Sequence, residues 1–315
     1  MVQEAQALID RYSYISILSH RNPEADTLGT ALGIYALLKA YGKSVEVVNI
    51  DRNLPNNLDF LPNFQKIKHG IDYEESLIIT CDASSIDLLG FDLSGREVLN
   101  IDHHRSSTYY GTVNVVKPDY AAASCVAYQL FKTFLPLNRE AVLCFYTALV
   151  SDTQYFTTSS VSKETFDIAS DMITFEIDIS QVAYNLRQRR TLASIRILTA
   201  ALQSLQLCFD GELAVMVATN DALKASGAKV SDLIGIVDHG LSLATVEVAI
   251  LVIEWEDHIC LSMRSKTVDI SQLAVSYGGG GHRQAAGFQT TLQDIDQFIQ
   301  RLKQEIKALG ILNGT

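Results

Sequence analysis

The sequence predicts an α/β protein with an N-terminal parallel-sheet domain, a helical connector and a smaller α/β C-terminal domain. Three observations support this. From Tyr14 to about Val116, short apolar runs alternate with helical or irregular stretches, which is typical of a parallel sheet. From Ala121 to Gln206 the pattern becomes helical, and at Asp210 it returns to strand-like runs.

The predicted strands of the first domain are the apolar runs YISILS, SVEVVNI, LIIT, VLNI and VNVV. Between the first two lies TLGTALGIYALLKAYG, which we interpret as the first crossover helix. Gly29 and Gly33 lie four residues apart on one face of it, and we expect them to allow close approach to the sheet. Asp26 or Thr27 is expected to cap this helix.

The second domain is predicted from the runs ELAVMVAT, ATVEVAILVIEW and HICLSMR, followed by the amphipathic helix IDQFIQRLKQEIKALG. The helical stretches before these runs are expected to cover the first domain and then to connect it to the second. We therefore expect residues 1–188 to form the first domain, 189–209 the helical connector, and 210–315 the second domain.

Composition limits the classes of function. No stretch approaches the roughly 18 to 20 apolar residues of a membrane span, and the amino terminus lacks the features of a signal peptide, so a cytoplasmic protein without a membrane partner is expected. The formal net charge of −11 opposes binding of long duplex DNA. Small phosphorylated ligands remain compatible, because cations gather locally around Arg264 and His282.

Three predicted strands end in side chains that can bind metals or carry protons. These residues are His20, Glu24 and Asp26 after the first strand, Asp82 after LIIT, and Asp102, His103 and His104 after VLNI; Asp152 follows the helix AVLCFYTALV. The carboxyl ends of parallel strands face one crevice, so we expect the strand-end residues to converge. Each residue alone could equally be a helix cap, but the joint pattern favours a common site.

The donor set contains imidazole and carboxylate groups without sulfur. Such donors suit Mn²⁺, Mg²⁺, Fe²⁺ or Zn²⁺, and the share of carboxylates favours the harder ions. Six candidate ligands exceed what one ion needs, and Asp82 could bridge two ions about 3.5 to 4 Å apart, as in phosphoryl-transfer sites. Two ions are therefore the preferred interpretation.

A glycine run, SYGGGGHRQAAGF, separates the last strand-like run of the second domain from its final helix. Consecutive backbone N–H groups without side chains could form a nest for an anion, with a cation added by His282. A flexible linker is the alternative. The small apolar residues that follow favour a packed structure, because a linker would continue with polar residues.

These motifs, in their order, resemble those of the DHH phosphoesterase family. The matching segments are SHRNPEADTLG (19–29), CDASS (81–85), IDHHRSS (101–107), VSDTQYF (150–156), SMRS (262–265) and GGGGHRQAAGF (278–288). The resemblance covers nearly the whole chain. Within the family, it is strongest to the NrnA-type oligoribonucleases that also dephosphorylate 3'-phosphoadenosine 5'-phosphate.

The resemblance implies a role for each site residue. His20 and Glu24 would hold one metal ion, and Asp26, His103 and Asp152 the other, with Asp82 bridging. His104 would face the scissile phosphate as a charge stabiliser or proton donor, with Asp102 behind it. In the second domain, the residues implied to grip the terminal phosphate or sugar of the substrate are Arg264, Ser265, Gly280, Gly281 and His282.

The chain departs from the family pattern at three points. Glu24 stands where Asp is usual, which shifts or loosens the first metal ion. Arg105-Ser106-Ser107 follows the histidine pair where an Asn is usual, and Gln154 replaces the Gly of the common DTG motif. These changes lie beside ligands, so substrate range or metal preference is expected to differ from other members.

The leading functional hypothesis is a Mn²⁺-dependent phosphoesterase with two ions, in which Mg²⁺ or Fe²⁺ could replace Mn²⁺. Its expected partners are short single-stranded oligonucleotides or small nucleotides, including 3'-phosphoadenosine 5'-phosphate. A cyclic dinucleotide phosphodiesterase is the first alternative, and a catalytically weakened nucleotide-binding protein is the second. The sequence leaves the oligomeric state open, and a homodimer is compatible with it.

Overall fold

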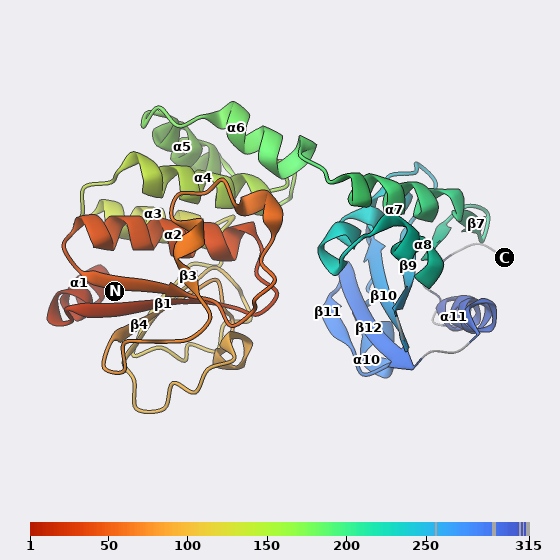
Figure 1. Ribbon diagram of the computed structural model, residues 1–315, viewed down its shortest axis with the longest axis horizontal. Coiled ribbons are helices and arrows are strands. Elements are labelled where there is room, and N and C mark those ends of the chain that lie inside the picture. Colours follow the sequence, from red (N-terminus) through yellow and green to blue (C-terminus); the bar gives the residue numbers. More distant parts are fainter. Residues whose placement is uncertain (256, 292–293, 309, 311, 313–315) are drawn as a thin grey trace. The chain divides into compact units, whose positions relative to one another are not determined.

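We describe a computed structural model of the chain, in which residues 1–255, 257–291, 294–308, 310 and 312 are described. The chain forms two compact units, Met1–Arg189 and Arg190–Thr315 (Figure 1). Helix α7 (Leu192–Gln203), which lies within the predicted connector, belongs to the second unit, where it packs on β8 (Leu213–Ala218).

The first unit begins with an α/β alternation and ends in helices. Its elements are α1 (Val2–Arg11), β1 (Tyr14–Ser19), α2 (Ala25–Ala40), β2 (Ser44–Val48), η1 (Asn56–Leu58), η2 (Phe64–Lys66), β3 (Ile67–Lys68), β4 (Leu77–Cys81), η3 (Ile86–Leu89), β5 (Val98–Asp102), β6 (Val113–Val116), α3 (Ala123–Lys132), α4 (Arg139–Asp152), α5 (Lys163–Ile173), α6 (Ile179–Ala183) and η4 (Tyr184–Gln188). The five predicted strands are present. The two-residue strand β3 was not predicted, because it is too short to show a periodic pattern.

All neighbouring strands of the first sheet are parallel, in the order β3-β2-β1-β4-β5-β6. The predicted parallel sheet is therefore confirmed. The chain order reverses between β1 and β4, and in open α/β sheets such a point leaves a crevice beyond the carboxyl ends of the strands. One face of the sheet packs on the helices, while the other is covered by η3 and the loops around it.

The glycines of α2 have a different neighbour from the one predicted. A Cβ atom on Gly29 would lie 2.7 Å from the carbonyl oxygen of Cys144, and one on Gly33 would lie 2.4 Å from the ring of Phe145. Both residues therefore allow close approach to α4, and the prediction that they face the sheet was wrong. The reason is that α2 is buried nearly all round, between the sheet and α4.

The predicted cap of α2 was also wrong. The N-cap residue is Glu24, without a side-chain capping hydrogen bond, and Asp26 and Thr27 lie in the first helical turn. Asp26 instead accepts hydrogen bonds from the backbone N–H groups of Ala123 (2.7 Å) and Ser124 (3.1 Å), at the start of α3. This contact joins helices that lie almost a hundred residues apart in the sequence.

The second unit contains a mixed six-stranded sheet in the order β11-β12-β10-β9-β8-β7. Its other elements are β7 (Gln206–Cys208), α8 (Asn220–Ser226), η5 (Val230–Leu233), α9 (Ile236–Leu241), β9 (Val248–Trp255), β10 (His258–Ser265), α10 (Ser271–Ser276), β11 (Gly280–His282), β12 (Ala285–Thr291) and α11 (Ile295–Ala308). Helices α7, α8 and α9 pack on one face, and α10 and α11 on the other. The last helix was predicted to run to Gly310; α11 is described to Ala308, Leu309 lies outside the described residues, and Gly310 lies in a turn.

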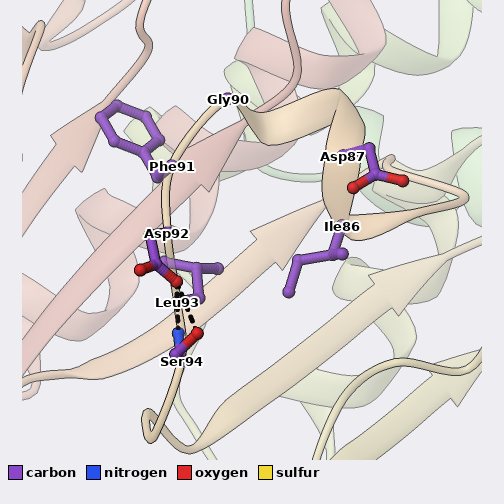
Figure 2. A pocket seen from close by; sticks show the side chains of 7 residues that line it. All are labelled: Ile86, Asp87, Gly90, Phe91, Asp92, Leu93 and Ser94. Carbon is purple, nitrogen blue, oxygen red and sulfur yellow. Dashed lines mark hydrogen bonds between the residues drawn. The ribbon is translucent and has the colours of Figure 1, made fainter.

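Within the described part of the chain, no helix is both long and apolar enough to cross a membrane. A cavity of about 390 Å³ is lined by η3 and by the loop that follows it (Figure 2). Asp87 and Asp92 contribute carboxylates to its lining, and Asp92 accepts hydrogen bonds from the backbone and hydroxyl of Ser94. With acidic and apolar walls, this cavity is a poor match for an anionic ligand.

Candidate metal centre

The register of the parallel strands places the predicted site residues of the first unit side by side at one edge of the sheet. Ser19 of β1 is aligned with Cys81 of β4, and Cys81 with Ile101 of β5. The next residue on each strand is therefore His20, Asp82 and Asp102, at the same edge of the sheet. The first turn of α2 adds Asp26, and the end of α4 adds Asp152.

His103 lies among three carboxylates. Its Nε2 atom is 3.8 Å from Asp26 Oδ2, 3.5 Å from Asp82 Oδ1 and 3.7 Å from Asp152 Oδ2. These distances are too long for good hydrogen bonds. The Nδ1–H of His103 donates to the carbonyl oxygen of Tyr120 at 3.2 Å, so Nε2 is the ring nitrogen that faces the carboxylates.

His20 is oriented in the same way. Its Nδ1–H donates to the carbonyl oxygen of Arg21 at 2.7 Å, and its Nε2 lies 3.6 Å from Asp82 Oδ2. The hydroxyl of Thr27 lies 2.5 Å from that Nε2 and donates to Asp82 Oδ2 at 2.8 Å. Glu24 completes this group, since ligand atoms of His20, Glu24 and Asp82 all lie within 4.8 Å of one another.

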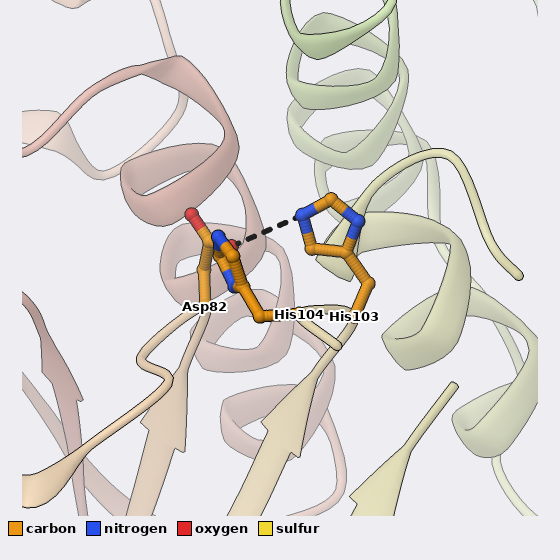
Figure 3. A group of neighbouring side chains, drawn as sticks. All are labelled: Asp82, His103 and His104. Carbon is orange, nitrogen blue, oxygen red and sulfur yellow. Dashed lines mark ion pairs between the residues drawn. The ribbon is translucent and has the colours of Figure 1, made fainter. Parts of the chain in front are cut away.

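His104 also faces Asp82, but its Nδ1 atom is hydrogen-bonded to a carboxylate and not to a backbone carbonyl. Figure 3 shows His103, His104 and Asp82 facing one another beyond the ends of two strands. The Nδ1–H of His104 donates to Asp102 Oδ1 at 2.7 Å, and the hydrogen bond raises the pKa of this imidazole to about 9. The same carboxylate oxygen accepts the backbone N–H of His103, which fixes the tight turn.

Several carboxylates of the site are buried, and one of their oxygen atoms lacks a hydrogen-bond partner within the described part of the chain, which indicates that the site suits a cation. Asp82 Oδ1 is buried and has no hydrogen-bond partner among the described residues. Burial, followed by the negative charge of Asp82, raises the pKa of Asp26, and burial with repulsion from Asp26 raises that of Asp152. A divalent cation would offset this repulsion. The histidine and aspartate residues here therefore form a divalent metal site, and the donor set fits the predicted ions.

Two residues of this site were missed by the sequence analysis as contributors to it. Thr27 was considered only as a helix cap, yet its hydroxyl joins His20 to Asp82. Tyr120 orients His103 through its backbone carbonyl, which leaves no signal in the sequence. Asp82 has a φ angle of 59°, a left-handed conformation that Asp tolerates better than most residues.

In the second unit, Arg264 and His282 lie in one row across the sheet. Both are aligned with Ala285, which stands between them on β12. Arg264 is half-buried, with its Nε atom 3.6 Å from Asp238 Oδ1, and His282 is exposed. Ser265 faces the opposite, buried side of β10, and its hydroxyl donates to the carbonyl oxygen of Val268 at 2.6 Å. The side chains of Arg264 and Ser265 therefore do not converge.

Part of the glycine run forms a short edge strand, β11. Gly280 and Gly281, with His282, pair with β12 in antiparallel register. A Cβ atom on Gly281 would lie 2.4 Å from the carbonyl oxygen of Ala285, so close packing on β12 explains this glycine. As an edge strand, β11 still has backbone groups that point away from β12.

Replacing Glu24 by Ala is expected to weaken binding of one metal ion at least tenfold, because a carboxylate close to His20 and Asp82 is lost. Glu24→Asp is expected to retain that ion. Mn²⁺ titration of the two variants by calorimetry checks this, with Glu75→Ala as the control for an exposed acidic residue elsewhere. Unchanged affinity in Glu24→Ala would remove Glu24 from the site.

Comparison with known proteins agrees with this geometry. Residues 14–150 match the DHH family, N-terminal domain, and residues 212–308 match the DHHA1 domain. The bifunctional oligoribonuclease and PAP phosphatase NrnA of Thermus thermophilus is 26% identical over 302 residues, which cover 93% of this chain and 89% of that protein. The cyclic-di-AMP phosphodiesterase PdeA of Listeria monocytogenes is 25% identical, over 98% of this chain and 49% of that protein.

A solved structure supports the fold. The crystal structure of an exopolyphosphatase-related protein from Bacteroides fragilis has a TM-score of 0.90 and 22% identity, and the match covers 98% of this chain and 96% of that one. Both domain matches follow the order that the sequence motifs predicted, and the first contains His20, Asp82 and His103. The chain is a hydrolase that belongs to the DHH family of phosphoesterases and carries a DHHA1 domain as its second unit.

Proposed function

We propose that this phosphoesterase hydrolyses oligonucleotides of a few residues to mononucleotides, with two Mn²⁺ ions, and also converts 3'-phosphoadenosine 5'-phosphate to AMP. The observation that carries the proposal is the matched orientation of His20 and His103. Each donates Nδ1–H to a backbone carbonyl and turns Nε2 towards Asp82. The names of relatives such as the Thermus NrnA support the substrate class.

In this proposal, His20 and Glu24 would hold one ion, Asp26, His103 and Asp152 would hold the other, and Asp82 would be a ligand of both. When bound, such ions polarise phosphoryl oxygens and lower the pKa of water. The chain contributes the orientation of its ligands. Thr27 fixes Asp82 through a hydrogen bond, and Asp26 is held by the N-terminus of α3.

His104 is proposed to donate a proton to the leaving oxygen or to stabilise its charge. Asp102 holds Nδ1, which leaves Nε2 as the atom that can meet the substrate. Arg264 and His282 are proposed to bind the terminal phosphate of the substrate. Both residues are aligned with Ala285, and both lie on the more accessible side of β10 and β11, where they can supply positive charge. Binding of the terminal phosphate is also proposed for Ser265, Gly280 and Gly281. The two glycines could contact a phosphate only through their backbone groups.

The test is a substrate panel with Mn²⁺ present. We expect rapid hydrolysis of a 5'-labelled RNA dinucleotide, measurable release of phosphate from 3'-phosphoadenosine 5'-phosphate, and at least tenfold slower cleavage of a 20-residue RNA. Hydrolysis of the 20-residue RNA at the dinucleotide rate would contradict the proposal. Metal-loaded protein that hydrolyses none of these substrates would favour a nucleotide-binding role.

A second candidate is a cyclic dinucleotide phosphodiesterase. The similarity to the Listeria PdeA, which is named for cyclic-di-AMP, favours it. The same panel separates the candidates when cyclic-di-AMP and its linear product are included. Faster cleavage of the cyclic compound than of the linear one would replace the first proposal with this one.

A further inference from the structure

A second cavity of the first unit, of about 420 Å³, is lined in part by residues that flank Asp152 of the metal centre in the sequence. Its walls come from η1, from the end of α4 and the turn after it, and from η4; they include Asn57, Ser151, Gln154, Tyr155, Leu186 and Arg187. Ser151 directly precedes the metal-site residue Asp152, so their Cα atoms are about 3.8 Å apart. The volume falls within the roughly 300 to 1,000 Å³ of small-molecule sites.

The turn after α4 has an unusual backbone. Gln154, Tyr155 and Phe156 have φ angles of 46°, 62° and 63°, so three successive non-glycine residues are left-handed. Such conformations cost free energy and persist where neighbouring contacts hold them. Here Tyr155 N–H donates to the carbonyl oxygen of Val150 at 2.8 Å, and Phe156 N–H to the hydroxyl of Thr153 at 3.1 Å. The turn therefore holds Gln154 and Tyr155 at the cavity.

The opposite wall is equally fixed. Element η4 is a turn of π-helix, a form that is rare and frequent at functional sites. Arg189 ties it to the loop after η1 through two hydrogen bonds with Asp59, at 2.5 and 2.7 Å. Arg187 lies over the ring of Tyr155, with 5.4 Å between its Cζ atom and the ring centroid.

The side chains of the cavity combine an aromatic ring, a cation and free amides. Arg187 is exposed and forms no salt bridge among the described residues, although the chain as a whole is strongly acidic. The side-chain amides of Asn57 and Gln154 likewise form no hydrogen bond within the described chain. Aromatic rings and guanidinium planes stack on nucleobases, and amides can pair with base edges.

We propose that this cavity binds one nucleotide unit of the substrate, with its base against Tyr155 and its phosphate near Arg187. The inference rests on the proposed function and adds a subsite that selects nucleotides over simple phosphodiesters. Gln154, which departs from the family motif, then contributes to base recognition. Arg187 is a substrate-binding residue here and takes no part in metal binding.

The test replaces Arg187 by Met, which keeps the aliphatic length and removes the charge. We expect the KM for an RNA dinucleotide to rise at least tenfold, with kcat within twofold. Hydrolysis of bis(p-nitrophenyl) phosphate, which has no base, should stay within twofold. Arg139→Met is the matched control, because Arg139 is exposed at the other end of α4, about 18 Å along the helix axis from Ser151.

Equilibrium binding of AMP to the Mn²⁺-loaded protein separates this inference from the proposed function. Arg187→Met should weaken AMP binding at least tenfold, and Arg139→Met should leave it unchanged. If the wild type hydrolyses no phosphodiester, but AMP binding is weakened by Arg187→Met and not by Arg139→Met, the proposed function fails while the assignment of the cavity as a nucleotide site is supported. Unchanged AMP affinity in Arg187→Met, with thermal unfolding as in the wild type, overturns the inference.

Discussion

Asp82→Asn is expected to lower the rate of dinucleotide hydrolysis on the order of 10³-fold and to reduce metal content. Asp82 is buried, and its two oxygens face different histidines: Oδ2 lies near His20 and Oδ1 near His103. An amide retains the shape and can still accept the hydrogen bond from Thr27. The variant therefore removes charge with little change in packing.

The measurement combines initial rates with metal analysis of the purified protein. Asp87→Asn is the matched control, because Asp87 is exposed in η3, which follows the same strand, and lies outside the metal centre. Its rate should equal that of the wild type. Activity within tenfold of the wild type in Asp82→Asn would show that this carboxylate does not hold the metal ions.

His104→Gln is expected to lower kcat about 10²- to 10⁴-fold, the usual contribution of a positioned acid or base. The metal content should stay unchanged, because the proposal assigns Nε2 of His104 to the leaving oxygen of the substrate and not to an ion; Asp102 holds its Nδ1–H. Asp102→Asn should have a smaller effect, about 10- to 100-fold, since it acts by orienting His104. Rates and metal content of both variants check this.

An alternative for His104 arises from the geometry. Ligand atoms of Asp82, His103 and His104 lie within 4.8 Å of one another, so the three could also hold an ion together. Loss of one ion per chain in His104→Gln would assign His104 as a ligand. Hydrolysis of a substrate with an activated leaving group distinguishes the roles further, because a proton donor matters less when the leaving oxygen is already acidic.

The sequence predicted the centre of this site well for a physical reason. Strand ends can be recognised from apolar runs, and parallel register then brings His20, Asp82 and Asp102 to the same level. Their chemistry follows from their side chains alone. The parallel sheet of the first unit and the strands β8, β9 and β10 of the second could be predicted in the same way, since these second-unit strands carry their own apolar patterns.

Features that depend on tertiary contacts could not be predicted. The carbonyl oxygen of Tyr120 faces His103 only because of the path of the chain between β6 and α3. Gly29 packs on α4, which follows it by more than a hundred residues. The left-handed turn at Gln154 and the strand at Gly280 likewise depend on partners that no local pattern reveals.

The most direct test of the central claim is a Mn²⁺ titration of metal-free protein while hydrolysis of an RNA dinucleotide is followed. A phosphoesterase with two ions at the His20–Asp82–His103 centre should gain activity as the second ion binds and reach its maximum at two ions per chain. Full activity with one ion per chain, or no dinucleotide hydrolysis with two bound, would contradict the account.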